Sequence, residues 1–198
     1  MEGTIHLVRH GEVENPKGVI YGRLPGYHLS ERGQRQAQAA AEHLRVRDIK
    51  AVVASPMERA QETAEAIAEP HGLGVATDGR FIESHSTIEG WARSALILLR
   101  SPKIWWHFRN PLKPSWGEAF SEIRVRMLEG VEELLQAHLG GEVVVVSHQT
   151  PVQVARLALA RRNVPPWVGL APCSTGSVTT MVLVGGRLVS LEYYAPPV

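Results

Sequence analysis

Short apolar runs alternate along the chain with segments that have the helical period. The first run, residues 4–8, is rich in β-branched side chains and breaks at once into Arg9-His10-Gly11. Residues 51–54 and 143–146 form two further apolar runs of strand length. Runs of this kind are typical of buried strands. The pattern therefore predicts three strands inside a sheet, each followed by polar residues.

Helical periodicity fills the intervals between these strands. Ala37, Ala40, Ala41 and Leu44 share one helical face, and we expect Ser30 to be the N-cap of that helix. The order of strand, helix, strand and helix predicts a parallel sheet with right-handed crossovers.

Three more helices are predicted further along the chain. Residues 55–58 have the form of a capping box, Ser-x-x-Glu, with proline at the first helical position. An apolar stripe over residues 120–134 predicts a long helix, and residues 151–160 predict another. Each helix would cover a face of the sheet.

The last part of the chain has the pattern of a β-hairpin. Residues 178–184 and 188–191 predict two strands joined by Gly185-Gly186, and hence an antiparallel edge of the sheet. No repeat, low-complexity segment or linker divides the chain. We therefore expect an α/β fold in one domain, residues 1–198, with a mostly parallel central sheet and an antiparallel edge.

Residues 88–116 are the least regular segment and are rich in tryptophan. One interpretation is a satellite hydrophobic cluster under a long loop. The other is a lid-like insertion over a pocket, in which Trp105 and Trp106 contribute to substrate specificity. The second interpretation rests on the position of the segment, between a candidate acid, Glu83, and the third predicted strand.

Length and composition are those of an ordinary globular protein, with 198 residues, 44% hydrophobic and 21% charged. The net charge of +1 and the lack of a Lys/Arg block argue against a nucleic-acid-binding surface. The single cysteine, Cys173, excludes an internal disulfide framework and a cysteine-based zinc site. No apolar run approaches the roughly 20 residues of a membrane span, and no signal-peptide pattern is present, so we expect a cytoplasmic protein.

The predicted strands end in residues suited to an anion. Arg9 and His10 follow the first strand, Ser55 and Arg59 follow the second, and His148 follows the third. Parallel strands place their carboxyl ends along one edge of a sheet, so these side chains can converge. Two arginines and two histidines in one crevice are electrostatically costly without an anion. A phosphoryl group is the natural fit, because its oxygens need several donors in the transition state.

A phosphoryl transfer that uses no metal needs its own nucleophile, and His10 qualifies because imidazole is a nucleophile near neutral pH. Glu83 is the candidate for protonating the leaving oxygen. Structural alternatives stay open for two residues. His148 could be a packed core histidine, and Glu83 could pair with a surface cation.

Three motifs follow one another in a distinctive order, Arg-His-Gly, Ser-Pro-x-x-Arg-Ala-x-x-Thr-Ala and Val-Ser-His. In this order and spacing they resemble the histidine phosphatase superfamily, also called the phosphoglycerate-mutase-like fold, over nearly the whole chain. The resemblance implies a three-layer α/β/α sandwich. The residues that carry it are Leu7-Val8-Arg9-His10-Gly11-Glu12, Tyr21-Gly22-Arg23, Leu29-Ser30-Glu31-Arg32-Gly33, residues 54–64, Ile82-Glu83 and Val145-Val146-Ser147-His148.

The resemblance also implies the roles of five catalytic residues. His10 would attack phosphorus in line and form a phosphohistidine. Arg9, Arg59 and His148 would hold the phosphoryl oxygens. Glu83 would act as an acid toward the leaving group and then as a base for the incoming water.

Two departures from the common family pattern affect the remaining site residues. The common family pattern has a phosphate-binding asparagine where this chain has Pro16, and the asparagine of this chain, Asn15, falls one residue earlier. The acidic motif lacks the usual Gly and Trp between its two acids, so Glu89 is the alternative to Glu83 as the acid. The expected substrate-binding residues beyond the tryptophans are Asn15, Gly22, Arg23 and Gln149.

The leading interpretation is a metal-independent phosphatase, a phosphoric monoester hydrolase of the histidine acid phosphatase type, acting on a small phosphorylated metabolite without a cofactor. A phosphoglycerate mutase is the alternative; the mutases that the chain resembles are typically longer after the acidic motif, which favours hydrolysis. A non-catalytic phosphate- or protein-binding member is the second alternative. Neither nucleic acid nor membrane is an expected partner. Exposed edge strands or the terminal hairpin would support a homodimer.

Overall fold

The computed structural model describes residues 1–91, 117–161 and 172–197. Within these ranges, six strands form one sheet in the order β3-β2-β4-β1-β5-β6. The strands are β1 (Gly3–Arg9), β2 (Ile49–Ala54), β3 (Val75–Thr77), β4 (Glu142–Ser147), β5 (Val178–Val184) and β6 (Arg187–Tyr194).

The sheet is parallel except at one edge. β1 pairs with β4, β4 with β2 and β2 with β3, all in parallel. β5 runs antiparallel to β1, and β6 runs antiparallel to β5. The predicted α/β fold, with a mostly parallel sheet and an antiparallel edge, is confirmed.

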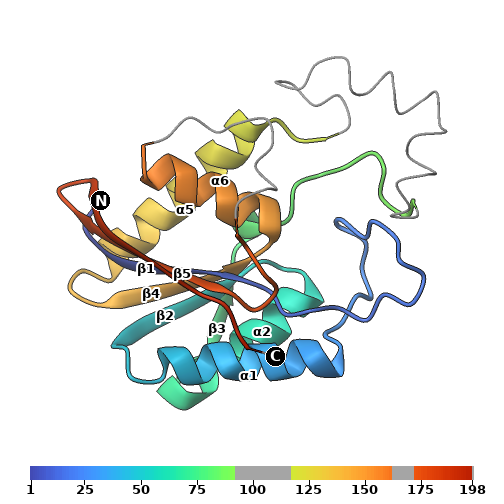
Figure 1. Cartoon of the computed structure of the whole chain (residues 1–198). Coiled ribbons are helices and arrows are strands. Elements are labelled where there is room, and N and C mark those ends of the chain that lie inside the picture. Colours follow the sequence, from blue (N-terminus) through green and yellow to red (C-terminus); the bar gives the residue numbers. More distant parts are fainter. Residues whose placement is uncertain (92–116, 162–171, 198) are drawn as a thin grey trace.

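Helices cover both faces of this sheet (Figure 1). α1 and α2 lie on one face, and α5 and α6 lie on the other, which gives the expected three-layer α/β/α sandwich. None of the described helices is long and apolar enough to cross a membrane. Their bounds are α1 (Glu31–Leu44), α2 (Glu58–Ala68), α5 (Phe120–Ala137) and α6 (Gln149–Leu159), with short 3₁₀ turns at η1 (Glu69–His71) and η2 (Gly79–Phe81).

The unbroken valine run of β4 reflects its place between two helical layers. Val143 and Val145 pack into the apolar cluster that includes α5 and α6. Val144 and Val146 pack into the cluster on the α1 and α2 side. Because successive side chains of a strand point to opposite faces, a strand covered on both faces needs apolar residues at every position.

The start of α1 agrees with its prediction, whereas the start of α2 does not. Ser30 caps α1, and its hydroxyl accepts a hydrogen bond from the backbone of the first turn. α2 begins at Glu58 without a side-chain cap, so the predicted capping box over residues 55–58 is wrong. The helix begins two residues later than predicted, with Met57 at the N-cap position, and the Ser55 hydroxyl accepts from the Met57 N–H at 3.4 Å and from the Nε2–H of His148 at 2.7 Å.

The loop after β1 approaches the first turn of α1 closely. A Cβ on Gly11 would lie 2.5 Å from the carbonyl oxygen of Gly33, and a Cβ on Gly33 would lie 2.0 Å from the carbonyl oxygen of Glu12. Only glycine allows backbones to come this near. The contact holds the segment around His10 against α1.

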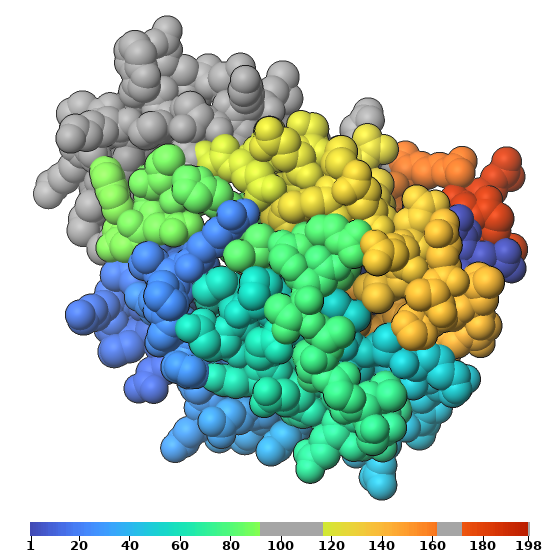
Figure 2. Space-filling view, turned by 180° about the vertical axis from the view of Figure 1, so that it is seen from behind, coloured from blue at the N-terminus to red at the C-terminus, as the bar shows by residue number. Residues whose placement is uncertain are grey.

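Residues 12–27 and 84–91 lie side by side at the rim of the sheet (Figure 2). The Ile20 N–H donates to the Trp91 carbonyl at 2.8 Å, and the Gly90 N–H donates to the Ile20 carbonyl at 2.7 Å. These two segments, which are distant in sequence, both contribute residues to the cavity described below.

The terminal hairpin forms as predicted. Gly185 and Gly186 have φ angles of +53° and +72°, the left-handed region that a tight two-residue hairpin turn requires. Most of the predicted lid-like insertion, with Trp105 and Trp106, falls on residues 92–116, which lie outside the described residues. The lid and the single-domain organisation therefore stay predictions.

Candidate active site

Three neighbouring parallel strands end at the same edge of the sheet and bring polar side chains together. β1 ends at Arg9 and is followed by His10, and β4 is followed by His148. β2 is followed by Ser55, with Arg59 in the first turn of α2. The rings of the two histidines lie 5.1 Å apart between their centroids, in an edge-to-face arrangement. The convergence expected from the sequence is thus present.

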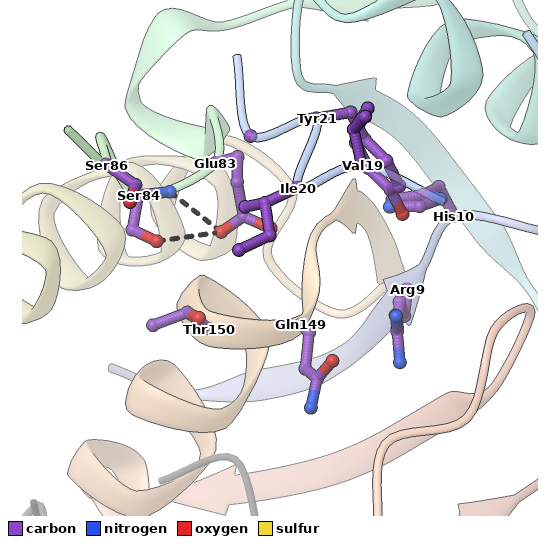
Figure 3. Close-up of a pocket in the computed structure, with 11 residues that line it drawn as sticks. Arg9, His10, Val19, Ile20, Tyr21, Glu83, Ser84, Ser86, Gln149 and Thr150 are labelled. Carbon is purple, nitrogen blue, oxygen red and sulfur yellow. Dashed lines mark hydrogen bonds between the residues drawn. The ribbon is translucent and has the colours of Figure 1, made fainter. Parts of the chain in front are cut away.

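A cavity of about 230 Å³ opens at this edge (Figure 3). Glu83, from the segment that follows η2, lines the cavity together with Arg9 and His10. The wall thus combines a carboxyl, a guanidinium and an imidazole. The remaining lining residues are Val19, Ile20, Tyr21, Gly22, Ser84, Ser86, Gln149 and Thr150.

The protonation state of His10 is set by its surroundings. The ring is 1% exposed, and its Nδ1 lies 2.7 Å from the carbonyl oxygen of Gly11. A carbonyl oxygen only accepts, so the network assigns the proton to Nδ1 and leaves the lone pair on Nε2. Burial, with the positive charges of Arg59 and Arg9, holds the pKa of His10 well below its ordinary value. The residue is therefore a neutral imidazole with a nucleophilic Nε2.

His148 is held in the opposite tautomer. An Nη2 hydrogen of Arg59 points to its Nδ1 at 3.3 Å, so Nδ1 is the acceptor and Nε2 carries the proton. The Nε2–H donates to the Ser55 hydroxyl at 2.7 Å. Burial, followed by the charges of His10 and Arg59, lowers the pKa of His148 well below its usual range. An anion near this ring would raise that pKa and favour the imidazolium.

Two guanidinium groups present unpaired donors at the same place. Arg59 is fully buried; its Nη2 donates to the Gly22 carbonyl at 2.7 Å, and its guanidinium carbon lies 4.9 Å from the centroid of the Tyr21 ring. Arg9 donates from Nη1 to the Cys173 carbonyl at 2.6 Å. Within the described residues, the Nε of both arginines and Nη1 of Arg59 are buried without a hydrogen-bond partner. Buried donors of this kind favour an anionic ligand.

Glu83 differs from an ordinary surface carboxyl. Burial is the largest influence on the group and raises its pKa. The Ser84 N–H donates to Oε1 of Glu83 at 2.7 Å, and the Ser84 hydroxyl lies 3.1 Å from the same oxygen; both contacts oppose that rise. A carboxyl with a raised pKa beside a nucleophile is suited to carry a proton.

The structure separates the two candidate acids. Glu83 lines the cavity with His10. Glu89 is not among the lining residues; its side chain packs where a Cβ on Gly22 would stand, and its Oε1 accepts from the Ser86 N–H at 3.2 Å. The position of Glu83 in the cavity wall therefore favours Glu83 over Glu89 as the acid.

The expected substrate-binding residues fall into three groups. Gly22 and Gln149 line the cavity. The Asn15 amide instead closes its own loop, with bonds to the Val19 carbonyl and N–H at 2.9 and 3.1 Å, and Arg23 contacts the main chain of Glu83. The third group, Trp105 and Trp106, lies outside the described residues.

Six lining residues were not proposed as site residues from the sequence: Val19, Ile20, Tyr21, Ser84, Ser86 and Thr150. Tyr21 stands one position before the Gly-Arg pair of its motif, but an aromatic residue in a polar loop carries no signal of its partner. Only the fold places its ring over Arg59. Ser84 and Thr150 are direct neighbours of Glu83 and Gln149, and that adjacency is the one signal that the sequence offered.

The arrangement of the described residues can bind a tetrahedral dianion and attack it. Donors from three strand ends meet there, a neutral imidazole lies among them, and a protonatable carboxyl closes one side. No group of three or more metal-ligating side chains occurs within the described ranges. An imidazole lone pair beside several unpaired cationic donors is an arrangement suited to phosphoryl transfer.

Comparison with known proteins gives the family. The sequence model of the histidine phosphatase superfamily (branch 1) matches residues 5–195. This chain belongs to the histidine phosphatase superfamily.

Relatives within the histidine phosphatase superfamily cover nearly the whole chain. Protein Rv0525 of Mycobacterium tuberculosis (strain ATCC 25618 / H37Rv) is 45% identical over 204 residues, which span 98% of this chain and 97% of the relative. A 2,3-bisphosphoglycerate-dependent phosphoglycerate mutase of Thermoplasma acidophilum is 31% identical, over 93% of this chain and 90% of its own.

A solved structure extends this similarity to three dimensions. The mycobacterial glucosyl-3-phosphoglycerate phosphatase Rv2419c, in its native structure, superposes with a TM-score of 0.78 at 27% identity. The match covers 98% of this chain and 97% of that chain. The expected phosphoglycerate-mutase-like fold is therefore confirmed, and the family includes both phosphatases and mutases.

Proposed function

We propose that this chain is a phosphatase that hydrolyses a small phosphorylated metabolite through a phosphohistidine at His10. The observation that carries the proposal is the state of His10. Its proton is on Nδ1, bound to the Gly11 carbonyl, so a neutral Nε2 lies beside the unpaired donors of Arg9 and Arg59. This arrangement favours attack on a phosphoryl group that the two arginines hold.

In the first step, the Nε2 lone pair of His10 forms a bond to phosphorus as the bond from phosphorus to the ester oxygen breaks. The electron pair of the broken bond stays on the leaving oxygen, which takes the proton of the Glu83 carboxyl. Arg9, Arg59 and His148 stabilise the charge on the three equatorial oxygens. The products are an alcohol, a phosphohistidine and a Glu83 carboxylate.

In the second step, water attacks the phosphorus of the phosphohistidine. The Glu83 carboxylate takes a proton from the water, the bond from nitrogen to phosphorus breaks, and the electron pair returns to Nε2 of His10. Inorganic phosphate leaves, and both residues regain their starting states. The positive charge that a metal would supply in other phosphatases comes here from the guanidinium groups.

The substrate is proposed to be small, because the cavity of about 230 Å³ holds little beyond a phosphoryl group and a short carbon skeleton. The names of the relatives support a phosphorylated metabolite as the substrate, although the substrate of one of them carries a sugar in addition to the glycerate. One is a phosphatase of glucosyl-3-phosphoglycerate, and another is a phosphoglycerate mutase. Gly22 and Gln149 are proposed to contact the substrate, and Trp105 and Trp106 to select it.

A mutase keeps one specific observation in its favour. The Thermoplasma acidophilum mutase matches this chain over 90% of its own length, so chain length does not separate the two activities. In that case the phosphoryl group of His10 would return to a second hydroxyl of the bound glycerate instead of passing to water.

The experiment is a paired assay of the purified protein without added metal. One arm follows phosphate release from p-nitrophenyl phosphate and a panel of phosphorylated metabolites, for the wild type and for His10→Ala. The other arm follows conversion of 3-phosphoglycerate to 2-phosphoglycerate. We expect phosphate release that falls by a factor on the order of 10³ or more in the variant.

Three other outcomes would overturn the proposal. Isomer conversion without phosphate release would make the chain a mutase. Undiminished phosphate release in a folded His10→Ala protein would exclude a phosphohistidine at His10 as the intermediate. Silence of the folded wild type in both arms would favour the non-catalytic, phosphate-binding alternative.

A further inference from the structure

Arg23 reaches the main chain of the proposed acid and does not line the cavity. Its Nε donates to the carbonyl oxygen of Glu83 at 2.7 Å. Its Nη2 donates to Oε2 of Glu118 at 3.0 Å. The side chain thus joins the loop of residues 12–27 to the segment that carries Glu83.

The peptide unit between Glu83 and Ser84 transmits this contact to the carboxyl group. In a trans peptide the C=O and N–H bonds point in opposite directions. Arg23 holds the carbonyl side, and the N–H on the other side donates to Oε1 of Glu83 at 2.7 Å. A rotation of this peptide would therefore move the donor that orients the carboxyl.

Arg23 is itself anchored through Glu118. The Oε1 and Oε2 of Glu118 accept from Nε and Nη2 of Arg126 at 2.7 and 3.0 Å, a bidentate pair in which both side chains are more than four-fifths buried. The remaining nitrogen of Arg126, Nη1, donates to the Arg80 carbonyl at 2.5 Å. Arg126 belongs to α5, a core helix, so the chain of contacts ends on a rigid element.

We propose that Arg23 is a positioning residue that fixes the peptide after Glu83 and thereby aims the Glu83 carboxyl at the leaving oxygen. The inference rests on the proposed function, because it assigns Glu83 the role of acid in the first step. It replaces the expectation that Arg23 binds substrate, since its Nε and Nη2 are engaged by protein groups.

The role has a kinetic signature that a general loss of structure lacks. Proton donation matters little when the leaving group is a good one, and its importance grows as the leaving alcohol becomes a weaker acid. The ratio kcat/KM reports the steps up to formation of the phosphohistidine. Arg23→Gln should therefore lower kcat/KM by at least about tenfold for phenyl phosphate, but by less than about threefold for p-nitrophenyl phosphate.

The pH profile supplies a second signature. The Ser84 N–H lowers the pKa of Glu83, so a peptide that turns away would let that pKa rise further. The charged groups that act on this carboxyl are Arg9 of β1 and Arg59 of α2, with His10 in the same cavity, and none of them is changed. The alkaline limb of the variant should therefore lie at higher pH than that of the wild type.

The experiment measures kcat/KM over a series of aryl phosphates for the wild type and four variants. Arg23→Gln removes both contacts, whereas Arg23→Lys keeps the charge and at most one of them. Glu118→Gln leaves the contact with Glu83 but weakens its anchor, so it should give a smaller change of the same kind. Arg45→Gln is the matched control, because Arg45 is an exposed residue at the C-terminal end of α1 that pairs with Glu42, and it should behave as the wild type.

We expect a steeper dependence on the leaving group in Arg23→Gln, an intermediate one in Arg23→Lys and Glu118→Gln, and none in Arg45→Gln. An equal loss for every substrate would show a merely structural role, and a rise in KM with an unchanged slope would show substrate binding; either result overturns the inference. If Arg23→Gln fails to fold, Glu118→Gln decides it by the same criterion. Failure of the proposed function is distinct, because it would remove hydrolysis from the wild type itself.

Discussion

The two buried histidines of the site are both neutral but are held in opposite tautomers. The Gly11 carbonyl fixes the proton of His10 on Nδ1, whereas Arg59 and Ser55 fix the proton of His148 on Nε2. Each ring is then ready for its own task. His10 offers a lone pair to phosphorus, and His148 offers a nitrogen whose pKa rises as the dianion arrives.

The opposed pKa shifts in the site determine the expected dependence of activity on pH. The pKa of His10 lies well below 6.5, so the acid limb of kcat/KM should lie well below pH 6.5. The pKa of Glu83 is raised above 4.5, so the alkaline limb, where the acid loses its proton, should lie above pH 4.5. The measurement is a pH profile with phenyl phosphate, corrected for the ionisation of the phosphate near pH ~6.

The variant Glu83→Gln serves as the control for this profile, because it should lose the alkaline limb and keep the acid limb. An acid limb at or above pH 6.5 in the wild type would contradict the depressed pKa of His10.

Ser55 supports the site through one hydrogen bond to His148. Ser55→Ala removes the acceptor of the Nε2–H and frees the ring to turn or change tautomer. A neutral hydrogen bond of this kind contributes about 1 kcal/mol, so kcat/KM should fall by about fivefold in Ser55→Ala. The control is Ser121→Ala, at an exposed position of α5, and its kcat/KM should change little. Wild-type kinetics in Ser55→Ala would show that the hydroxyl does not orient the ring.

At the scale of elements, the contact between the β1 loop and α1 depends on Gly33. Alanine favours a helix over glycine by about 1 kcal/mol, but here its Cβ would lie 2.0 Å from the Glu12 carbonyl oxygen. The clash should dominate, and Gly33→Ala should lower the free energy of unfolding by about 2 kcal/mol. Urea denaturation measures the change.

The matched control for this substitution is Gly74→Ala. No atom lies within 4 Å of the Cβ that it would add, so its free energy of unfolding should stay within about 0.5 kcal/mol of the wild type. A stabilised Gly33→Ala protein would show that helix propensity outweighs the contact.

Features that depend on neighbouring residues could be predicted from the sequence, whereas contacts between residues far apart in the sequence could not. The cap at Ser30 and the Gly185-Gly186 turn are local devices, and both are confirmed. Ser55 carries the same local signal as Ser30, but α2 begins two residues later and the Ser55 hydroxyl binds His148, which is far away in the sequence. Local pattern does not reveal which of two partners a side chain will choose.

The same limit applies to the candidate site. Arg9, His10, Arg59 and His148 could be assembled because parallel strands end on one edge. The link from α5 to Glu83 could not, since Glu118, Arg126 and Arg23 have no periodic or motif signal that joins them. Such contacts depend on the path of the loops, which pattern alone does not determine.

At the scale of the whole molecule, the net charge of +1 hides a strong local concentration of positive groups. Two guanidinium groups lie at the edge of the sheet where the parallel strands end, and burial keeps the histidines beside them neutral. The fold thereby holds a site for an anion that the overall charge does not indicate.

The folded protein should become less stable as the pH falls below about 6.5, because His6, His10 and His148 all have lowered pKa values. Below that pH the unfolded chain binds more protons at these residues than the folded one. Each contributes up to about 1.4 kcal/mol per pH unit, whereas the raised pKa values of Glu83 and of the exposed His28 oppose the trend.

Urea midpoints at about pH 7.5 and about pH 5.5 measure this dependence, and we expect a clearly lower midpoint at the acidic pH. His10→Asn removes one of the three groups and should reduce the difference. A midpoint that rises on acidification would contradict the neutral state of the buried histidines.

The central claim, that His10 carries the phosphoryl group, is tested most directly by trapping the phosphoenzyme. The protein is mixed with p-nitrophenyl phosphate and quenched in alkali, where phosphohistidine survives, and the modified residue is located by mass spectrometry, with phosphorus NMR to identify the nitrogen. We expect phosphate on Nε2 of His10 in the wild type, more of it in Glu83→Gln, and none in His10→Ala. Phosphate on another residue, or turnover without any phosphohistidine, would contradict the mechanism.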